Sequence, residues 1–303
     1  MYHYVRDGSP DLPDLRYLHL DDFRRQLDWL GERFEFPSRD EVFAAVAGGR
    51  APSGVVLTFD DGLRDHYEHV LPELERRGLW GFFFVPTGMY RTRQLLGVHR
   101  IHALLACFDP EVLLEAVTPL VRDEMLTDAG REEFRSIPYA THDVADSAIA
   151  FKRTLNYFVS YEWRGAVLDR LMSTFFGDEA ALVDRHYLSV DQLREMAAAG
   201  MEIGSHGDLH LVMSKLPADE QRRDLADSFE WLAATLGTRP RSFCHPYGGD
   251  HTFDRDTEVA LAELGCQLAF NVEPRDATDD DVRERVQRLP RYDCNELPHG
   301  RAR

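Results

Sequence analysis

The sequence predicts an α/β fold in which parallel strands alternate with helices and close into a barrel. Short apolar runs rich in β-branched and aromatic residues alternate with amphipathic stretches of helical period, the pattern of parallel strands joined by helices. Three polar clusters, TFDDG, GSHGDLH and HPYGG, each follow one of these runs, and barrel enzymes carry their catalytic groups at such strand ends. An open parallel sheet has the same alternation, but seven candidate strands favour a barrel.

The candidate strands are the apolar runs at 2–5, 54–59, 81–86, 201–205, 241–246, 267–272 and 288–293. Helices are expected between them, over 20–34, 38–49, 64–78 and 217–237. Ser38 is a suitable N-cap for the second of these helices and Gly48 a suitable stop.

Residues 92 to about 190 interrupt the alternation. They contain no convincing strand and predict several helices, among them 95–108, 111–126 and 149–176. An insertion at this point would lie over one barrel mouth as a lid or specificity element, with structural cladding as the alternative. Because no polar linker divides the chain, we expect residues 1–303 to form one domain that carries this helical insertion.

Composition excludes several classes of protein. With 35 Lys and Arg against 53 Asp and Glu, the net charge of −18 opposes binding to nucleic acid or anionic lipid. The first twenty residues show no signal or transit peptide, and no later run has membrane-spanning length, so a cytoplasmic protein without a membrane span is expected. The four cysteines include no CxxC pair and are interpreted as buried thiols.

Two histidines and two aspartates suggest a metal site. His206 and His210 are four residues apart, so both imidazoles point to one side if the loop winds into a helical turn. A carboxylate from Asp60 or Asp61 would complete a set of three ligands with open positions for water and substrate. The other aspartate could then stay ionised beside the cation and act as a general base. The alternative is a DDG turn whose aspartates cap the following helix.

The chain resembles the NodB-type polysaccharide deacetylases (carbohydrate esterase family 4) in three successive motifs. The family's motifs are TFDDG, H(S/T)xxH and RxPY, and the corresponding segments here are TFDDG, then HGDLH, then PYG after a strand. The resemblance covers roughly residues 1–91 and 191–293. It implies a distorted (β/α)7 barrel, an incomplete TIM-like fold, and hydrolysis of an N-acyl group from an amino sugar. It also implies a divalent metal, usually zinc, with Co²⁺, Ni²⁺, Mn²⁺ or Fe²⁺ as alternatives.

Carried over by position, the resemblance makes Asp60 the general base. Asp61, His206 and His210 become the metal ligands, and the backbone N–H of Tyr247 a donor to the developing oxyanion.

Three departures from the family pattern need an explanation. Gly207 replaces the Ser or Thr of the second motif, and Asp208 is expected to supply an acceptor for a ligand imidazole instead. Cys244 stands in place of the third motif's arginine, and we expect Arg291 to reach the base from the last strand.

The third departure is the general acid. The family's C-terminal LxH motif is absent, since Leu297 and His299 have the wrong spacing. In some relatives this motif has moved to the N-terminus by circular permutation, and a barrel allows this because its first and last strands are neighbours. His3 is therefore the expected acid, with a structural histidine at a strand end as the alternative.

The remaining histidines are interpreted without a catalytic role. His99 and His102 are assigned to packing or lid contacts, and His66 and His69 to an exposed helix face. His245 either lines the substrate pocket or packs in the core.

The cytoplasmic expectation favours a biosynthetic intermediate as substrate: a nucleotide-linked, lipid-linked or small N-acylated glycoside. Two other classes stay open. Two histidines and a carboxylate also form the triad of non-haem iron oxygenases, although the adjacent second carboxylate argues against that chemistry. The missing motif arginine and hydroxyl are also compatible with a catalytically inactive sugar-binding homologue.

Overall fold

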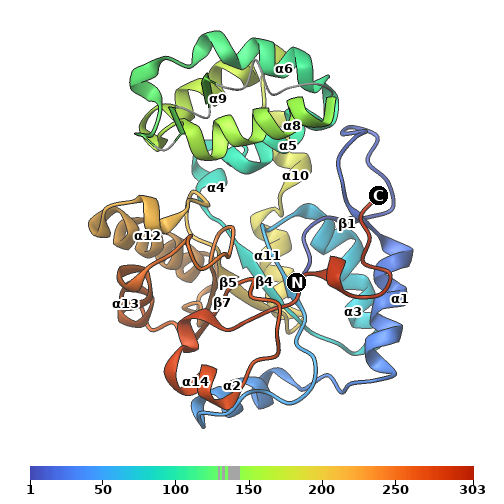
Figure 1. Cartoon of the computed structure of the whole chain (residues 1–303). Coiled ribbons are helices and arrows are strands. Elements are labelled where there is room, and N and C mark those ends of the chain that lie inside the picture. Colours follow the sequence, from blue (N-terminus) through green and yellow to red (C-terminus); the bar gives the residue numbers. More distant parts are fainter. Residues whose placement is uncertain (129, 132–133, 136–143) are drawn as a thin grey trace. The chain divides into compact units, whose positions relative to one another are not determined.

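The computed structural model describes residues 1–128, 130–131, 134–135 and 144–303 (Figure 1). They divide into two compact units. The first unit comprises Met1–Gly8, Arg16–Thr92 and Asp184–Arg303, and the second comprises Ser9–Leu15 and Arg93–Val183. No helix in the described part of the chain has the length and apolar composition needed to cross a bilayer.

A parallel sheet forms the centre of the first unit (Figure 1). Its five strands lie in chain order: β3 (Thr58–Phe59), β4 (Phe82–Val85), β5 (Glu202–Ser205), β6 (Ser242–Cys244) and β7 (Leu268–Phe270). Isolated parallel bridges extend the sheet at both edges, from Tyr2 to Phe59 and from Phe270 to Leu289. The two bridges and the five strands fall within the seven runs that the sequence predicts as strands.

Hydrogen bonds from Met1 link the two edges of this sheet. The Met1 amino group donates to the carbonyl of Tyr292 at 2.6 Å, and the backbone N–H of Cys294 donates to the carbonyl of Met1 at 3.1 Å. The first and last segments of the curled sheet are therefore neighbours.

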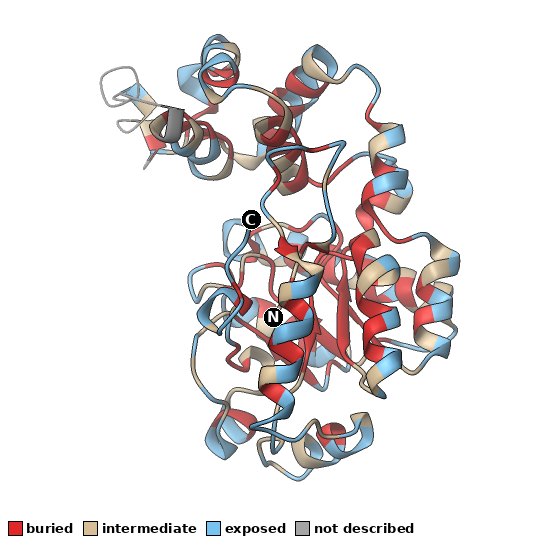
Figure 2. Cartoon of the chain, turned by 90° about the vertical axis from the view of Figure 1, so that its right-hand side faces the viewer, coloured by how far each residue is buried: buried red, intermediate tan, exposed pale blue. Residues whose placement is uncertain are grey.

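The strands are buried on both faces (Figure 2), and successive side chains point to opposite sides. One cluster includes Phe82, Phe84, Cys244, Phe270 and Leu289. Residues between these positions pack under the helices, as Phe243 does against Phe229 and Leu225 of α12 (Ala218–Leu236). Because the face that holds Phe84 and Cys244 also receives Asp60 and Arg291, this alternation decides which polar groups meet.

The four helices predicted in the first unit are present near their expected boundaries, with the one expected over 64–78 divided into a π-helix and an α-helix. Ser38 caps its helix, with its hydroxyl accepting from the Glu41 N–H, and Gly48 is the C-cap, as predicted. The further elements are β1 (Val5–Arg6), β2 (Leu18–His19), α1 (Leu20–Gly31), α2 (Arg39–Ala47), the π-helix η1 (His66–Val70), α3 (Leu71–Arg77), α4 (Gly88–Thr92), α11 (Val190–Ala198), η5 (Met213–Lys215), α13 (Arg255–Glu263), α14 (Asp279–Glu284), η6 (Val286–Arg288) and η7 (Cys294–Glu296).

The second unit is helical in its described residues, apart from an isolated bridge between Leu126 and Val159. Arg100 is buried there against Glu179 and Asp169, and Cys107 is only partly buried, unlike the other three cysteines. The elements are α5 (Gly97–Cys107), α6 (Pro110–Val117), η2 (Thr118–Leu120), η3 (Asp123–Met125), α8 (Val144–Arg153), η4 (Thr154–Phe158), α9 (Tyr161–Phe175) and α10 (Ala180–His186), the last of which runs on into the first unit. Part of the predicted helix-rich segment, at 129, 132–133 and 136–143, lies outside the described residues.

Candidate metal centre and catalytic cluster

Asp60 and Asp61 follow β3 directly, and the chain turns sharply after them. Asp61 has φ +81° and Gly62 φ +61°, both in the region that side chains with a Cβ rarely adopt. The carbonyl of Gly62 accepts from the backbone N–H of Leu188 at 3.0 Å, which holds the turn in place. Both carboxylates are buried, so the turn keeps two adjacent acids out of water.

Asp61 meets the two histidines of the second motif. Its Oδ1 lies 3.4 Å from His206 Nε2 and 3.4 Å from His210 Nε2, and all three side chains are buried. His206 directly follows β5, and His210 ends the loop at φ +54°. The structure thus brings together the three residues that the sequence suggests as ligands.

The spacing of these three donors fits a shared cation. Ligand atoms at about 2.1 Å from a tetrahedral zinc are separated by about 1.6 times that distance, or about 3.4 Å. Two imidazole nitrogens and a carboxylate oxygen are also a donor set typical of catalytic zinc.

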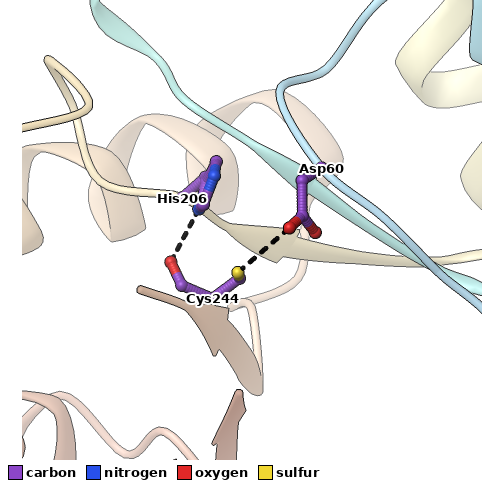
Figure 3. Close-up of side chains that lie close together, drawn as sticks. All are labelled: Asp60, His206 and Cys244. Carbon is purple, nitrogen blue, oxygen red and sulfur yellow. Dashed lines mark hydrogen bonds between the residues drawn. The ribbon is translucent and has the colours of Figure 1, made fainter. Parts of the chain in front are cut away.

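The surroundings of His206 fix its orientation and favour positive charge. Its Nδ1 donates to the carbonyl of Cys244 at 2.6 Å (Figure 3), which leaves the Nε2 lone pair facing Asp61. Burial alone would lower the pKa of His206, but its interactions with Cys244 and with the Asp61 and Asp60 carboxylates raise it well above its usual range. The same negative potential favours a metal cation.

Asp60 points instead to an arginine. Arg291 donates to both carboxylate oxygens of Asp60 at 2.9 Å, and also to the hydroxyl of Thr58 and the sulfur of Cys244. Burial would raise the pKa of Asp60, but the Arg291 guanidinium holds it well below its usual range. Asp60 is therefore an ionised carboxylate of fixed orientation beside the Asp61 cluster.

Cys244 completes a second group of possible donors with Asp60 and His206 (Figure 3). Its thiol lies 3.4 Å from Asp60 Oδ2, and burial raises the thiol's pKa, which opposes formation of a thiolate ligand. The Arg291 cation already contacts both Asp60 and Cys244. This group is therefore a poor metal site.

His3 lies at the same cluster. Its Nε2 is 4.0 Å from Asp60 Oδ2, and about two-fifths of its side chain is exposed (39%). His66 fixes the backbone of His3 by a hydrogen bond, because its Nε2 lies 3.0 Å from the His3 carbonyl oxygen. The described tail places His299 at the surface.

Tyr247 lies beside His210, with ring centroids 5.0 Å apart. It follows β6 and has φ +62°, and Gly248 has φ +70°. Asp61, His210 and Tyr247 are thus three of five described residues other than glycine with positive φ, and such strained backbone concentrates at functional sites.

Two expectations about neighbouring residues are wrong. Asp208 does not turn to an imidazole; its carboxylate accepts from Thr87 at 2.6 Å and from Arg91. His66 is fully buried rather than exposed, and burial lowers its pKa to about 4. The spacing of Leu63, His66, Val70 and Leu74 matches the buried face of a helix, and that signal would have identified it.

Of the remaining histidines, His245 packs in the core. It stacks on Phe253 with ring centroids 3.8 Å apart, and its Nε2 is 2.7 Å from the Gln287 carbonyl. His99 is buried within the second unit.

Comparison with known proteins supports the family suggested by the motifs. Residues 169–269 match the family described as polysaccharide deacetylase; this range contains His206, His210 and Tyr247. The YxkH protein of Bacillus subtilis (strain 168), whose name assigns it to the polysaccharide deacetylases, is 26% identical over 110 residues, 36% of this chain and 38% of YxkH. The match thus spans well under half of that relative.

Several solved deacetylases share the fold. Streptococcus pyogenes deacetylase PplD, solved in complex with acetate, superposes with a TM-score of 0.57 at 18% identity, over 96% of this chain and 89% of PplD. The deacetylase domain of BpsB from Bordetella bronchiseptica gives 0.52 at 17% identity, over 96% and 94% of the two chains. The resemblance to NodB-type polysaccharide deacetylases is confirmed. The predicted fold class, a distorted (β/α)7 barrel, is also confirmed: the parallel sheet curls into a half-barrel with surrounding helices.

The geometry predicts that Asp61→Asn weakens zinc binding by more than about 100-fold, the upper end of the losses caused by changing only an outer-shell partner, because a neutral amide replaces the one charged donor. Isothermal titration of the metal-free protein with Zn²⁺ measures this. Asp40→Asn, an exposed aspartate on α2, is the control and should bind zinc as the wild type does. Equal affinity for Asp61→Asn and the control would contradict the site.

Proposed function

We propose that this protein is a metal-dependent hydrolase that removes an N-acetyl or other small N-acyl group from an amino-sugar-containing substrate. The observation that carries this proposal is that two groups of charged and polar side chains lie next to each other. Three buried metal donors meet at Asp61, and an ionised Asp60, held by Arg291, lies next to them.

Asp61, His206 and His210 would hold the cation, with zinc the first choice. When bound, a divalent cation supplies Lewis acidity to the acyl oxygen and to a water molecule. The protein's own groups then move the protons and orient the substrate.

Asp60 is the proposed acceptor of a proton from the attacking water; its lowered pKa, which keeps it ionised, and the two hydrogen bonds from Arg291 to its oxygens support this role. The oxygen of that water bonds to the acyl carbon, and the backbone N–H of Tyr247 is proposed to donate to the acyl oxygen as charge develops there. His3 then protonates the nitrogen as the C–N bond breaks, because an amine cannot leave as an anion at useful rates. One water is consumed, and a carboxylic acid and a free amine are released.

The same proposal treats the chain as one NodB-like domain with the helical segment 92–190 as an insertion. The finer substrate assignment, to a nucleotide-linked, lipid-linked or small glycoside in the cytoplasm, stays a prediction.

The proposal is tested by acid release from a panel of N-acetylated amino sugars of these three kinds and from an N-acetylglucosamine polymer. Zinc-loaded protein should release acetate, chelation should stop it and added zinc restore it. Asp60→Asn should lower turnover by about 10²-fold to 10⁴-fold, the range of general-base catalysis. Oxygen uptake without acid release would favour the oxygenase instead, and binding without turnover the inactive homologue.

His3→Ala should lower kcat by about 100-fold or more while zinc affinity and KM change little, because His3 is proposed to protonate only the leaving nitrogen. Steady-state kinetics and zinc titration measure the three quantities. His299→Ala is the matched control at the other candidate histidine and should leave kcat unchanged. Loss of activity in His299→Ala alone would reverse the assignment.

Arg291→Ala should lower kcat by about 100-fold while the protein still binds one zinc ion, because Arg291 orients the base rather than the metal. Arg291→Lys retains the charge and guards against misfolding; it should lose less activity, since one ammonium cannot hold both oxygens. Arg288→Ala, at a partly exposed arginine paired with Glu258, is the control and should have the kcat and zinc binding of the wild type. Wild-type turnover in Arg291→Ala would dismiss the role.

A further inference from the structure

The loop between His206 and His210 carries two of the three metal donors within five residues. Its carbonyls are held from one side, where the backbone N–H groups of Thr87 and Gly88 donate to Gly207 at 3.2 Å and Asp208 at 2.8 Å. The position of both imidazoles therefore depends on what fixes the rest of this backbone.

Asp224 holds the opposite side of the loop. It lies on α12, and its side chain is buried. Its Oδ1 accepts from the backbone N–H of Asp208 at 2.8 Å and its Oδ2 from that of Leu209 at 3.0 Å. A single carboxylate thus binds two successive N–H groups between the two ligands, with the charge-assisted hydrogen bonds that are the stronger kind.

Gly207 allows this approach. It has φ +75°, and a Cβ at this position would lie 2.8 Å from Asp224 Oδ1. A Ser or Thr, as in the family's second motif, would need the carboxylate to move. The departure at Gly207 and the contact made by Asp224 are therefore one structural feature.

We propose that Asp224 is a positioning residue for the metal site: its carboxylate fixes the loop that presents His206 and His210 to the cation. This inference rests on the proposed function, because it assumes that these histidines bind a metal. It assigns to Asp224 and Gly207 the bracing that the motif's hydroxyl residue is expected to supply.

The buried face of α12 supports a role beyond packing. Ser228, one helical turn further along α12, lies 2.7 Å from Ser205 in β5, hydroxyl to hydroxyl, and the Ser205 hydroxyl in turn accepts from the Gly207 N–H at 3.2 Å. Polar groups on this helix thus contact the loop at three successive backbone N–H groups, directly or through Ser205.

The test is zinc affinity, measured by titration of metal-free protein. Asp224→Asn keeps the shape but turns an amide NH₂ toward one of the two backbone donors, so zinc should bind about 10-fold to 100-fold more weakly. Saturating zinc should restore most of the lost kcat with KM unchanged, which a general loss of stability would not do. Asp219→Asn, at an exposed aspartate on the same helix, should bind zinc as the wild type does.

Gly207→Ala tests the same contact from the loop side and keeps the test decisive if Asp224→Asn does not fold. It should also weaken zinc binding, and the double variant should lose less than the product of the two separate losses, because both act through one contact. Wild-type zinc affinity in Asp224→Asn, or in Gly207→Ala where the former does not fold, would overturn the inference. A wild-type protein that binds no zinc would contradict the proposed function itself.

Discussion

The ion pair between Asp60 and Arg291 is the constraint around which the rest of the site is arranged. Both side chains are buried within the curled sheet, where an unpaired charge would be strongly unfavourable; breaking a buried pair typically costs about 3–5 kcal/mol. Arg291 reaches Asp60 from the last segment of the sheet, and its Nε also donates to the Asn271 carbonyl. The pair therefore joins the two ends of the sheet. It also keeps Asp60 ionised and fixes the orientation of its carboxylate. Asp61 is left to face the histidines.

The backbone around this pair is strained at three residues of the candidate site. Asp61, His210 and Tyr247 adopt positive φ, which disfavours residues with a Cβ. Such conformations persist only when the surroundings determine them, and here they do: Leu188 holds the turn after Asp61, and Asp224 holds the loop before His210. Rigid strands and braced loops together bring polar side chains from distant parts of the chain to one point, with the fixed geometry that the proposed function needs.

Where sequence reasoning succeeded, the signal was local. Asp60, Asp61, His206 and His210 are named by short motifs at strand ends, and the strands by apolar runs. Where it failed, the deciding contact was distant in the chain. Asp208 was expected to brace an imidazole, but Thr87 and Arg91 take its carboxylate. The pattern assigns His66 to an exposed helix face, but the side chain is buried and hydrogen-bonded to the carbonyl of His3. Asp224 has no sequence signal of its contacts, because one acidic residue in a long amphipathic helix resembles any other on the same pattern.

The sequence by itself determined the alternation of strands and helices, the places of the strands along the chain and the residue types able to hold a metal, because these follow from periodicity and from motifs a few residues long. Only the tertiary structure decided that Asp61 rather than Asp60 faces the two imidazoles, that Arg291 lies against Asp60 beside Cys244, and that His3 reaches the cluster. These are contacts between residues up to 231 positions apart in the sequence. They depend on how the sheet curls and on which way each side chain is turned by the backbone, and no local pattern records either.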